Sequence, residues 1–301
     1  MQSKPQQPPN KHHYVPEFLL KEWRNAQGSV WRHFRNARGV IDCKAQAPGG
    51  MGYQPGLYAI DGLPLEHKQQ VETKFMEPLD TAANRVHQLL LAGHVSALTD
   101  EQHSRWAGLI MSLWFRTPAE VEGIRSAVDA LYERHLKQTA LDPEGPIELP
   151  NASLNQLAMD VLMQSIDNGE RGGELINMHW DVIEIDGPRE LCISDSPLAQ
   201  PTNYARLGTP ASYIGLAISP TKLFVAAKSP TFIGMLRTLP QRELVARQNR
   251  AAVSQAEHFV GTRCRTTDKF IRENFGTAER LSLTRGIAEK YRADAENAQD
   301  A

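Results

Sequence analysis

Apolar residues recur every three or four positions through the middle of the chain, a spacing that predicts helices with one buried face. The clearest repeat lies within residues 65–91 and consists of Val71, Phe75, Leu79, Ala82, Val86 and Leu90. Pro78 lies inside this repeat, and because proline lacks a backbone N–H we expect it to kink or split the helix. Further helices are predicted at residues 154–166, 241–260 and 267–274.

Two segments have the sequence of a capping box, in which a Thr side chain and a Glu or Gln three positions later bond reciprocally at a helix start. They are Thr99 to Gln102 and Thr117 to Glu120. Because the second box follows the first predicted helix directly, we expect two tightly connected helices with Arg116 at their junction.

Short apolar runs bounded by turn residues predict strands on both sides of the helical region. On the N-terminal side, residues 30–34 and 39–43 have the pattern of a hairpin. On the C-terminal side the runs are residues 179–185, 191–194, 213–219 and 222–227. Gly and Pro between them favour antiparallel connections. The pattern predicts an α+β fold, in which a central helical bundle packs with a mainly antiparallel sheet in a single large domain.

Composition sets the expected limits of this domain. Residues 1–10 are rich in Gln and Pro and offer little to bury, so we expect them to be disordered. Residues 287–301 are charged and are expected to form a flexible tail, which leaves residues 11–286 as the domain. No apolar stretch approaches the roughly 20 residues that span a bilayer, and no signal-peptide pattern is present. We therefore expect no membrane contact and a cytoplasmic location.

The three cysteines, Cys43, Cys192 and Cys264, lie far apart and form no Cys-x-x-Cys pair. Their spacing disfavours a zinc knuckle or a thioredoxin-type centre and fits a reducing compartment, with the three as ordinary core or surface residues. Phosphate-loop, dinucleotide-binding, zinc-protease and esterase signatures are also absent, which disfavours the common enzyme designs that depend on them.

Charge is unevenly distributed along the chain. Residues 11–44 contain seven Lys or Arg against three Asp or Glu, and residues 237–272 contain eight against three. Residues 119–190 reverse this balance, with five basic and fifteen acidic residues. If the two basic flanks meet in the fold, they form a positive surface suited to nucleic acid or a phosphorylated ligand. The alternative is that these charges are solvated helix faces.

The segment His12-His13-Tyr14-Val15-Pro16 is the most distinctive in the chain. Pro16 favours an extended conformation before it and a helix after it. Neighbouring residues of an extended strand point to opposite sides, so one histidine is expected to face inward and the other a surface or loop. Each is a candidate metal ligand, general base or phosphate contact. The alternative is that the inward histidine donates to a backbone carbonyl and pins the N-terminus.

Two charged residues of the helical region are candidates for the same site. Glu72 lies at the border of the apolar stripe, where its carboxylate can reach a cleft as a metal ligand or acid–base group, or pair with a basic residue. Arg116 ends one helix just before the next, so it can stabilise the helix C-terminus or clamp a phosphate.

Two polar residues of the C-terminal half complete the set. Asp195 follows the strand at residues 191–194, where it can present its carboxylate from a turn or simply cap that turn. Asn249 interrupts an apolar stripe made by Val245, Ala252, Ala256 and Phe259. A buried amide needs partners, so we expect Asn249 to support the His-motif backbone rather than to react.

These residues resemble a bacterial family of unknown function that is marked by the His-His-Tyr-Val-Pro motif. The similarity includes Leu20 and Trp23 after the motif, then Glu72, Arg-Thr-Pro at residues 116–118, Ser-Asp-Ser-Pro at 194–197, the segment 216–220 and Asn249. It extends from about Lys11 to about Val260. Ser196 departs from the Asn usual in the family, which leaves Asp195 and Pro197 in place. The resemblance implies a shared fold and no established activity.

Together the residues support two hypotheses. In the first, the protein is a metal-assisted, nuclease-like phosphodiester hydrolase. Glu72 and Asp195 then hold a divalent metal ion, His12 or His13 is the general base, and Arg116 stabilises the charge on phosphorus, with Tyr14 and Asn249 in support. In the second, the same polar cluster is structural, and the protein is a non-enzymatic module that binds a ligand or a partner.

Overall fold

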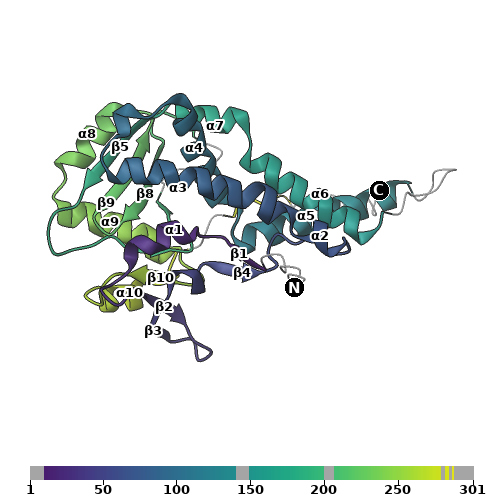
Figure 1. The fold of residues 1–301 in the computed structure, drawn as a ribbon, viewed down its shortest axis with the longest axis horizontal. Coiled ribbons are helices and arrows are strands. Elements are labelled where there is room, and N and C mark those ends of the chain that lie inside the picture. The colour runs from purple at the N-terminus through teal and green to yellow at the C-terminus, as the bar shows by residue number, and fades with distance from the viewer. Residues whose placement is uncertain (1–9, 140–148, 200–206, 279–281, 285–286, 288–301) are drawn as a thin grey trace, which may run out of the picture.

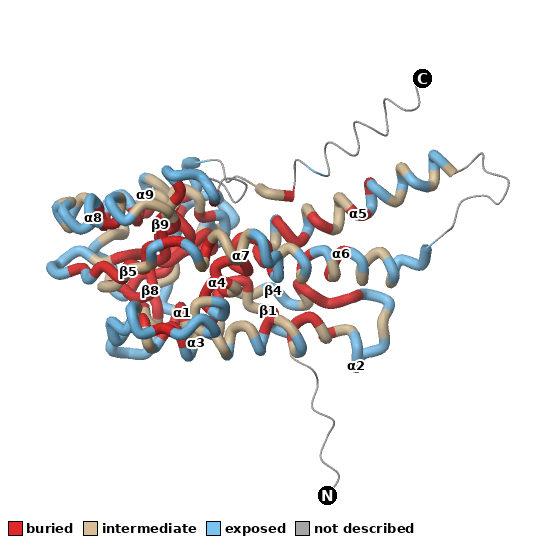
Figure 2. The backbone as a smooth tube through the Cα atoms, turned by 90° about the horizontal axis from the view of Figure 1, so that it is seen from above, coloured by how far each residue is buried: buried red, intermediate tan, exposed pale blue. Residues whose placement is uncertain are grey.

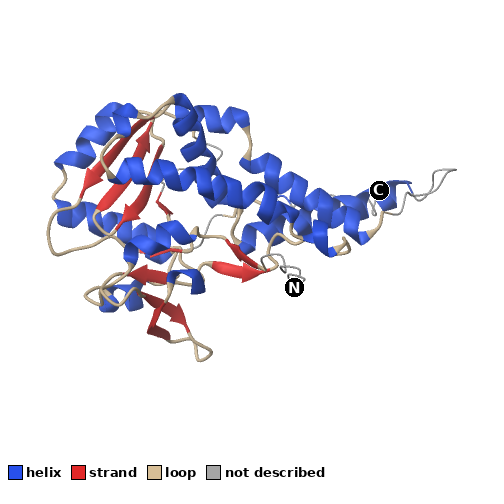
Figure 3. Ribbon diagram, viewed as in Figure 1, coloured by secondary structure: helices blue, strands red, loops and turns tan. Residues whose placement is uncertain are grey.

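The computed structural model places three antiparallel sheets against a layer of long helices (Figures 1 and 3). It describes residues 10–139, 149–199, 207–278, 282–284 and 287. The expected disordered segment 1–10, apart from Asn10, and the expected tail 287–301, apart from Ile287, lie outside these residues. The mixture of helices and antiparallel strands confirms the α+β class.

The strands form one ribbon and two four-stranded sheets, with strand orders β1-β4, β3-β2-β10-β6 and β5-β9-β8-β7. Neighbouring strands in the described residues pair antiparallel throughout. We call the second of these, whose strands are shorter on the whole, the small sheet and the third the large sheet. The strands are β1 Lys11–His13, β2 Val30–Arg35, β3 Ile41–Gln46, β4 Tyr53–Pro55, β5 His179–Glu184, β6 Ile193–Ser194, β7 Leu198–Ala199, β8 Tyr213–Ser219, β9 Lys222–Ala227 and β10 Val260–Thr262.

The helices join and cover these sheets. The α-helices are α1 Glu17–Leu20, α2 Leu65–Lys68, α3 Glu77–Leu91, α4 Asp100–Phe115, α5 Pro118–Thr139, α6 Asn151–Ile166, α7 Gly169–Ile176, α8 Pro230–Thr238, α9 Gln241–Ser254 and α10 Asp268–Asn274. Short 3-10 turns lie at η1 Lys21–Trp23, η2 Pro48–Gly50 and η4 Val95–Ala97, and a π-helical turn, η3, at Glu72–Met76. None of the described helices is both long and apolar enough to cross a membrane.

The large sheet is the centre of the core, because side chains from helices on both of its faces meet it. Trp106 of α4 contacts the ring of Phe224 edge-on at 5.6 Å. On the other face, Gln248 of α9 bonds the backbone of Gly215. In Figure 2 the buried backbone concentrates around β8, β9 and α4, whereas α5 and α6 extend away from the sheets and become exposed. The hydrophobic pattern therefore predicted the helices well, but three separate sheets take the place of one.

The predicted helix at residues 65–91 is broken at Gln69, where α2 ends, and not at Pro78. The helical path resumes at Gln70 and runs through the π-helical turn η3 into α3. Pro78 is the second residue of α3 and has no N–H to donate to the carbonyl four residues earlier. A π-helical turn pairs each N–H with the fifth preceding carbonyl, as Glu77 does with Glu72, and so absorbs this interruption.

The predicted helix at residues 241–260 is too long at its C-terminal end. Helix α9 stops at Ser254, and residues 260–262 form strand β10 in the small sheet. Ala256 and Phe259 are buried as expected, but they belong to the turn between α9 and β10. The carboxylate of Asp195 accepts hydrogen bonds from the backbone of this turn and thereby competes with the helix.

The second predicted capping box is only half formed. The first is complete at Thr99 and Gln102. In the second, Glu120 donates its N–H to Thr117 Oγ1 at 3.5 Å, but its side chain turns elsewhere. The buried carboxylate accepts from the N–H groups of Leu283 and Thr284 at 3.0 and 3.1 Å and from the Thr284 hydroxyl at 2.8 Å. Glu120 therefore attaches the C-terminal segment to α5.

We expect Glu120→Ala to lower the free energy of unfolding by about 2–4 kcal/mol, because it leaves buried donors without their charged acceptor. Urea unfolding followed by circular dichroism measures the change. Glu122→Ala, an exposed position on the same helix, is the matched control and should shift the free energy by less than about 0.5 kcal/mol. Equal effects in the two variants would contradict this role.

Candidate functional site

The guanidinium of Arg116 is completely buried at the C-terminal end of α4 and joins three parts of the chain. Its Nε donates to the Tyr14 carbonyl at 3.1 Å, and its Nη1 donates to Asp80 Oδ1 of α3 at 2.8 Å. The carbonyl oxygen of Arg116 accepts from the Tyr58 hydroxyl at 2.9 Å. Arg116 thus holds the His-motif segment against α3 and the loop that carries Tyr58. We call Arg116 and the groups around it the central cluster.

His12 is the inward histidine, as the alternation along β1 predicted. It is fully buried, and its ring stacks on Tyr58 at a centroid distance of 5.3 Å. The expected bond to a backbone carbonyl is wrong, because His12 Nδ1 instead accepts the Tyr58 N–H at 2.8 Å. A nitrogen that accepts a hydrogen bond carries no proton, so the neutral ring is protonated on Nε2. His12 therefore pins the N-terminal segment through its acceptor nitrogen.

His13 lies on the opposite side of β1, as expected, and is half-buried with its ring against Tyr53 at 5.6 Å. Burial lowers its pKa below the usual 6.5 because the charged imidazolium loses water. Glu17 opposes this shift, and the positive charge of Arg116 adds to it. The His13 ring is consequently neutral at physiological pH.

Glu72 lies on the π-helical turn, and its side chain is almost wholly buried. Burial raises the pKa of its carboxyl to about 8, and the nearby Asp80 carboxylate raises it further than Arg116 can offset. Glu72 is therefore largely protonated at neutral pH. Burial also raises the pKa of Asp80, although Arg116 beside it favours the ionised form.

The π-helical turn explains why Glu72 and Asp80 lie on the same face of this helical segment, where the charge of Arg116 acts on both. Eight positions separate them, which in a regular helix places them about 80° apart at about 100° per residue. A π-helical turn accommodates one extra residue, so the pair is separated by seven regular steps and lies within about 20° of the same face. Sequence reasoning missed Asp80 for this reason. It also missed Tyr58, whose apolar neighbours gave no sign of a buried hydroxyl contact.

Three polar atoms of the central cluster are buried without a hydrogen-bond partner in the described part of the chain. They are Glu72 Oε2, Arg116 Nη2 and His13 Nε2. Leaving such an atom unpaired costs about 1–3 kcal/mol, and more when the group is charged. Unsatisfied groups of this kind are rare and mark places where a ligand, an ion or water binds. Glu72 and His13 each lie close enough to Arg116 for its charge to shift their pKa, so the cluster gathers titratable groups around one cation.

Asp195 lies elsewhere, at the end of β6, with an exposed fraction of only 1%. Its two carboxylate oxygens accept from the N–H groups of Glu257, His258 and Phe259 at 2.9–3.3 Å. These bonds fix the turn that leads into β10. Neither of the two groups of three metal-ligating side chains in the described residues contains Glu72, and Asp195 belongs to one of them, with Glu257 and His258. Sequence reasoning identified neither of those neighbours.

Tyr14 and Asn249 have different surroundings from each other. The ring of Tyr14 lies 6.1 Å from that of His258, so the Asp195 group borders the His-motif segment.

Asn249 Oδ1 accepts the Cys192 N–H at 2.8 Å, and its Nδ2 donates to the Glu190 carbonyl at 2.9 Å. Asn249 therefore finds backbone partners as predicted, but it supports the segment before β6 and not the His motif.

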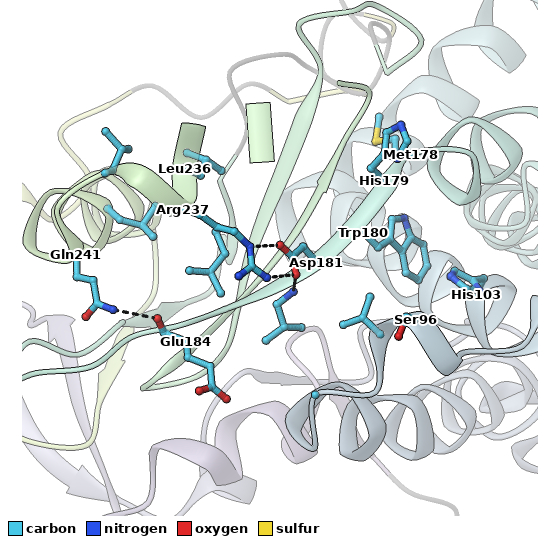
Figure 4. Close-up of a pocket in the computed structure, with 16 residues that line it drawn as sticks. Ser96, His103, Met178, His179, Trp180, Asp181, Glu184, Leu236, Arg237 and Gln241 are labelled. Atoms are coloured by element: carbon cyan, nitrogen blue, oxygen red, sulfur yellow. Dashed lines mark hydrogen bonds and ion pairs between the residues drawn. The ribbon is translucent and has the colours of Figure 1, made fainter. Parts of the chain in front are cut away.

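A separate cavity of about 840 Å³ lies along β5, the edge strand of the large sheet (Figure 4). Arg237 reaches across it and donates to both carboxylate oxygens of Asp181, at 2.6 and 2.7 Å. Asp181 also accepts the Val182 N–H, and Gln241 donates to the Glu184 carbonyl. These bonds cover the backbone edge of β5 and satisfy the main charges of the cavity. The central cluster, with its unpaired buried atoms, is the stronger candidate site.

Residues 11–265 match the family model described as "Protein of unknown function (DUF4238)". No curated protein and no solved structure matches the chain. The matched region begins at Lys11, where the His-His-Tyr-Val-Pro segment starts, and it contains every residue of the central cluster. Since the match covers most of the 301 residues, the chain belongs to the DUF4238 family of proteins of unknown function.

Proposed function

We propose that this protein is a phosphodiester hydrolase and that the central cluster is its acid–base site. The observation that carries the proposal is a pair of groups whose pKa values are shifted in opposite directions. Glu72 has a raised pKa and holds a proton at neutral pH, whereas His13 has a lowered pKa and holds none. Environments that push two titratable groups apart in this way are typical of a general acid and a general base.

The groups have complementary tasks in such a reaction. His13 Nε2 accepts a proton from the attacking water, whose oxygen forms the new bond to phosphorus. Arg116 Nη2 donates to a non-bridging phosphate oxygen and stabilises the negative charge that develops there. Glu72 gives its proton to the leaving oxygen as the old P–O bond breaks. The Asp80 and His13 side chains are each partly exposed, whereas His13 Nε2 is buried, so the attacking water has to enter the cluster.

The meeting of the basic flanks supports a polyanionic substrate such as nucleic acid. Strand β10, from the C-terminal basic flank, pairs with β2 of the N-terminal basic flank. Cationic side chains lie over aromatic rings on this sheet, with Arg32 and Lys44 at Phe34 and Arg265 at Trp31. Basic groups interleaved with aromatic rings are a combination that binds phosphates and stacks on bases.

A divalent ion fits the proposal through Asp195. Asp195, Glu257 and His258 each present one ligand atom, and these atoms lie within 4.8 Å of one another. Their contact with Tyr14 brings the group to the border of the His-motif segment. In this form of the proposal the ion binds the substrate phosphate, while Glu72 acts as the acid and is not a metal ligand.

The bonds among the cluster's own groups favour a second candidate, a non-enzymatic ligand-binding module. His12, Tyr58 and Asp80 are each bonded within the protein, as a structural network requires. The remaining unpaired atoms would then receive a phosphate or carboxylate without transforming it. Binding of inorganic phosphate with no cleavage of any phosphodiester would distinguish this candidate.

We expect Glu72→Gln to lower kcat/KM for cleavage of fluorogenic RNA or DNA by about 10²–10⁴, because the variant loses the general acid. Arg116→Lys should also lower it, since lysine cannot provide the same fork of donors. Glu66→Gln, an exposed position on α2, is the matched control and should retain wild-type activity. Each variant is first shown to be folded by circular dichroism.

The same assay with EDTA, and then with Mn²⁺ or Mg²⁺ restored, tests the metal. If the wild type depends on the metal and Asp195→Asn does not, the result supports a metal ion at Asp195. Full wild-type activity in EDTA would show that the reaction needs no metal ion. Glu72→Gln with wild-type activity would rule out the acid role.

The pH dependence should follow the two shifted groups. Activity needs His13 deprotonated, so it should rise with pH through a pKa below 6.5 and then level. It also needs Glu72 protonated, so it should fall again through a pKa of about 8. A kcat/KM profile between pH 5 and 10 measures both limbs. Activity that continues to rise above pH 9 would contradict the assignment of Glu72.

The stability of the protein should reveal the Glu72 proton independently of any substrate. The carboxyl has a pKa of 4.5 when unfolded and about 8 when folded, so its stabilising proton is present below 4.5 and lost as pH rises through 8. Glu72→Gln, which stays neutral, should therefore gain stability over the wild type by on the order of 2–4 kcal/mol at pH 9 and almost none at pH 4.5. Urea unfolding at both values, with Glu66→Gln as control, measures the difference. A gain that is the same at both pH values would contradict the raised pKa.

A further inference from the structure

A second cluster of metal-ligating side chains lies on the small sheet and shares no residue with the central cluster or with the Asp195 group. His33 of β2 and Cys43 of β3 are directly opposite each other in the hairpin register. Asp268, the first residue of α10, approaches the same place. One ligand atom from each of the three lies within 4.8 Å of the other two. Directly opposite residues share a face of a sheet, so the hairpin itself brings the imidazole and the thiol together.

Both ring nitrogens of His33 face acceptor atoms. His33 is fully buried, and its Nδ1 lies 3.4 Å from the Val260 carbonyl, which can only accept a proton. Its Nε2 lies 2.8 Å from Asp268 Oδ1, which is also an acceptor. In a neutral ring only one nitrogen carries a proton, so the other presents a lone pair to an acceptor. A second proton resolves this conflict, and so does a metal ion on Nε2, for which the ring and the carboxylate move apart by roughly 0.5 Å.

The thiol of Cys43 favours the metal over the second proton. A His–Asp ion pair needs no third group, whereas the half-buried Cys43 Sγ completes a set of one nitrogen, one sulfur and one oxygen ligand. Burial and the Asp268 carboxylate raise the pKa of Cys43 to about 11, so without a metal the thiol keeps its proton. A metal ion displaces such a proton when it binds.

The surrounding groups also suit a metal centre. The carbonyl of Val260 fixes the His33 ring through Nδ1, an arrangement typical of metal-bound histidine. Arg265 donates to Asp268 Oδ2 at 2.7–2.8 Å, which leaves Oδ1 as a single ligand atom. The charges within reach of the thiol are Asp42 and Asp268, which favour a cation, and Arg265 and Arg272, which oppose one. The two acidic and two basic side chains near the thiol therefore balance in number.

We propose that His33, Cys43 and Asp268 bind a zinc ion. Nitrogen, thiolate and carboxylate ligands together are the set that Zn²⁺ takes in proteins, whereas Mg²⁺ and Ca²⁺ require oxygen ligands. Three protein ligands leave a fourth position for water or another small ligand. The ion joins the β2–β3 hairpin to α10 and so fastens the basic small sheet. The cysteine spacing in the sequence could not show this site, because its ligands come from two strands and a helix.

Co²⁺ substitution tests the proposal on the full-length protein, prepared metal-free in a reducing agent that does not bind metals. One equivalent of Co²⁺ should produce a thiolate-to-cobalt charge-transfer band, and Zn²⁺ should displace it. Cys43→Ser should remove the band, and Asp268→Asn should weaken Co²⁺ binding by about tenfold or more. Cys264→Ser, a second half-buried cysteine, is the matched control and should keep the band.

The absence of a charge-transfer band in the wild-type protein, or a band that survives Cys43→Ser, overturns the site. The wild-type measurement decides the question even if a variant fails to fold. Glu72→Gln should leave the band unchanged, so this result stands or falls separately from the proposed hydrolase activity.

Discussion

The buried guanidinium of Arg116 is the constraint on which the arrangement of this protein depends. A fully buried charge is tolerated only with partners, and Arg116 takes them from the His-motif backbone and from α3 while its own carbonyl holds Tyr58. The N-terminal segment is consequently placed by a charge in the middle of the chain. Removing that charge would leave Asp80 with a raised pKa and no counter-ion, so segment and site would be lost together.

The central cluster also lowers the free energy of unfolding. A carboxyl with a pKa of about 8 and three buried polar atoms without partners all oppose folding. Natural cores rarely retain such groups, and where they persist they belong to binding or catalytic sites. Asn249 and Glu120 provide the contrast, because their buried side chains are fully engaged with the backbone.

Much of the fold and part of the site could be predicted from local sequence. The helical repeat, the β2–β3 hairpin, the irregular turn just before Pro78 and the inward face of His12 all follow from rules that span a few residues. What failed involved partners that are distant in sequence. The end of α9 depends on Asp195, some sixty residues earlier, and the direction of Glu120 depends on a segment far beyond it. The proposed zinc site likewise depends on Asp268 of α10, which is 235 positions from His33 in the sequence.

The π-helical turn η3 makes the hydrogen-bond pattern of the backbone a determinant of chemistry. It places Glu72 on the same helix face as Asp80 by accommodating one more residue than a regular helix would. If substitutions converted the turn to regular α-helix at the same chain length, Glu72 would rotate by about 100° relative to Asp80. Deletion of one residue from the turn would instead leave seven regular steps between the two carboxyl groups and keep them on one face. The orientation of the buried acid therefore tolerates a shorter chain at this point, but it does not tolerate a regular helix of the same length.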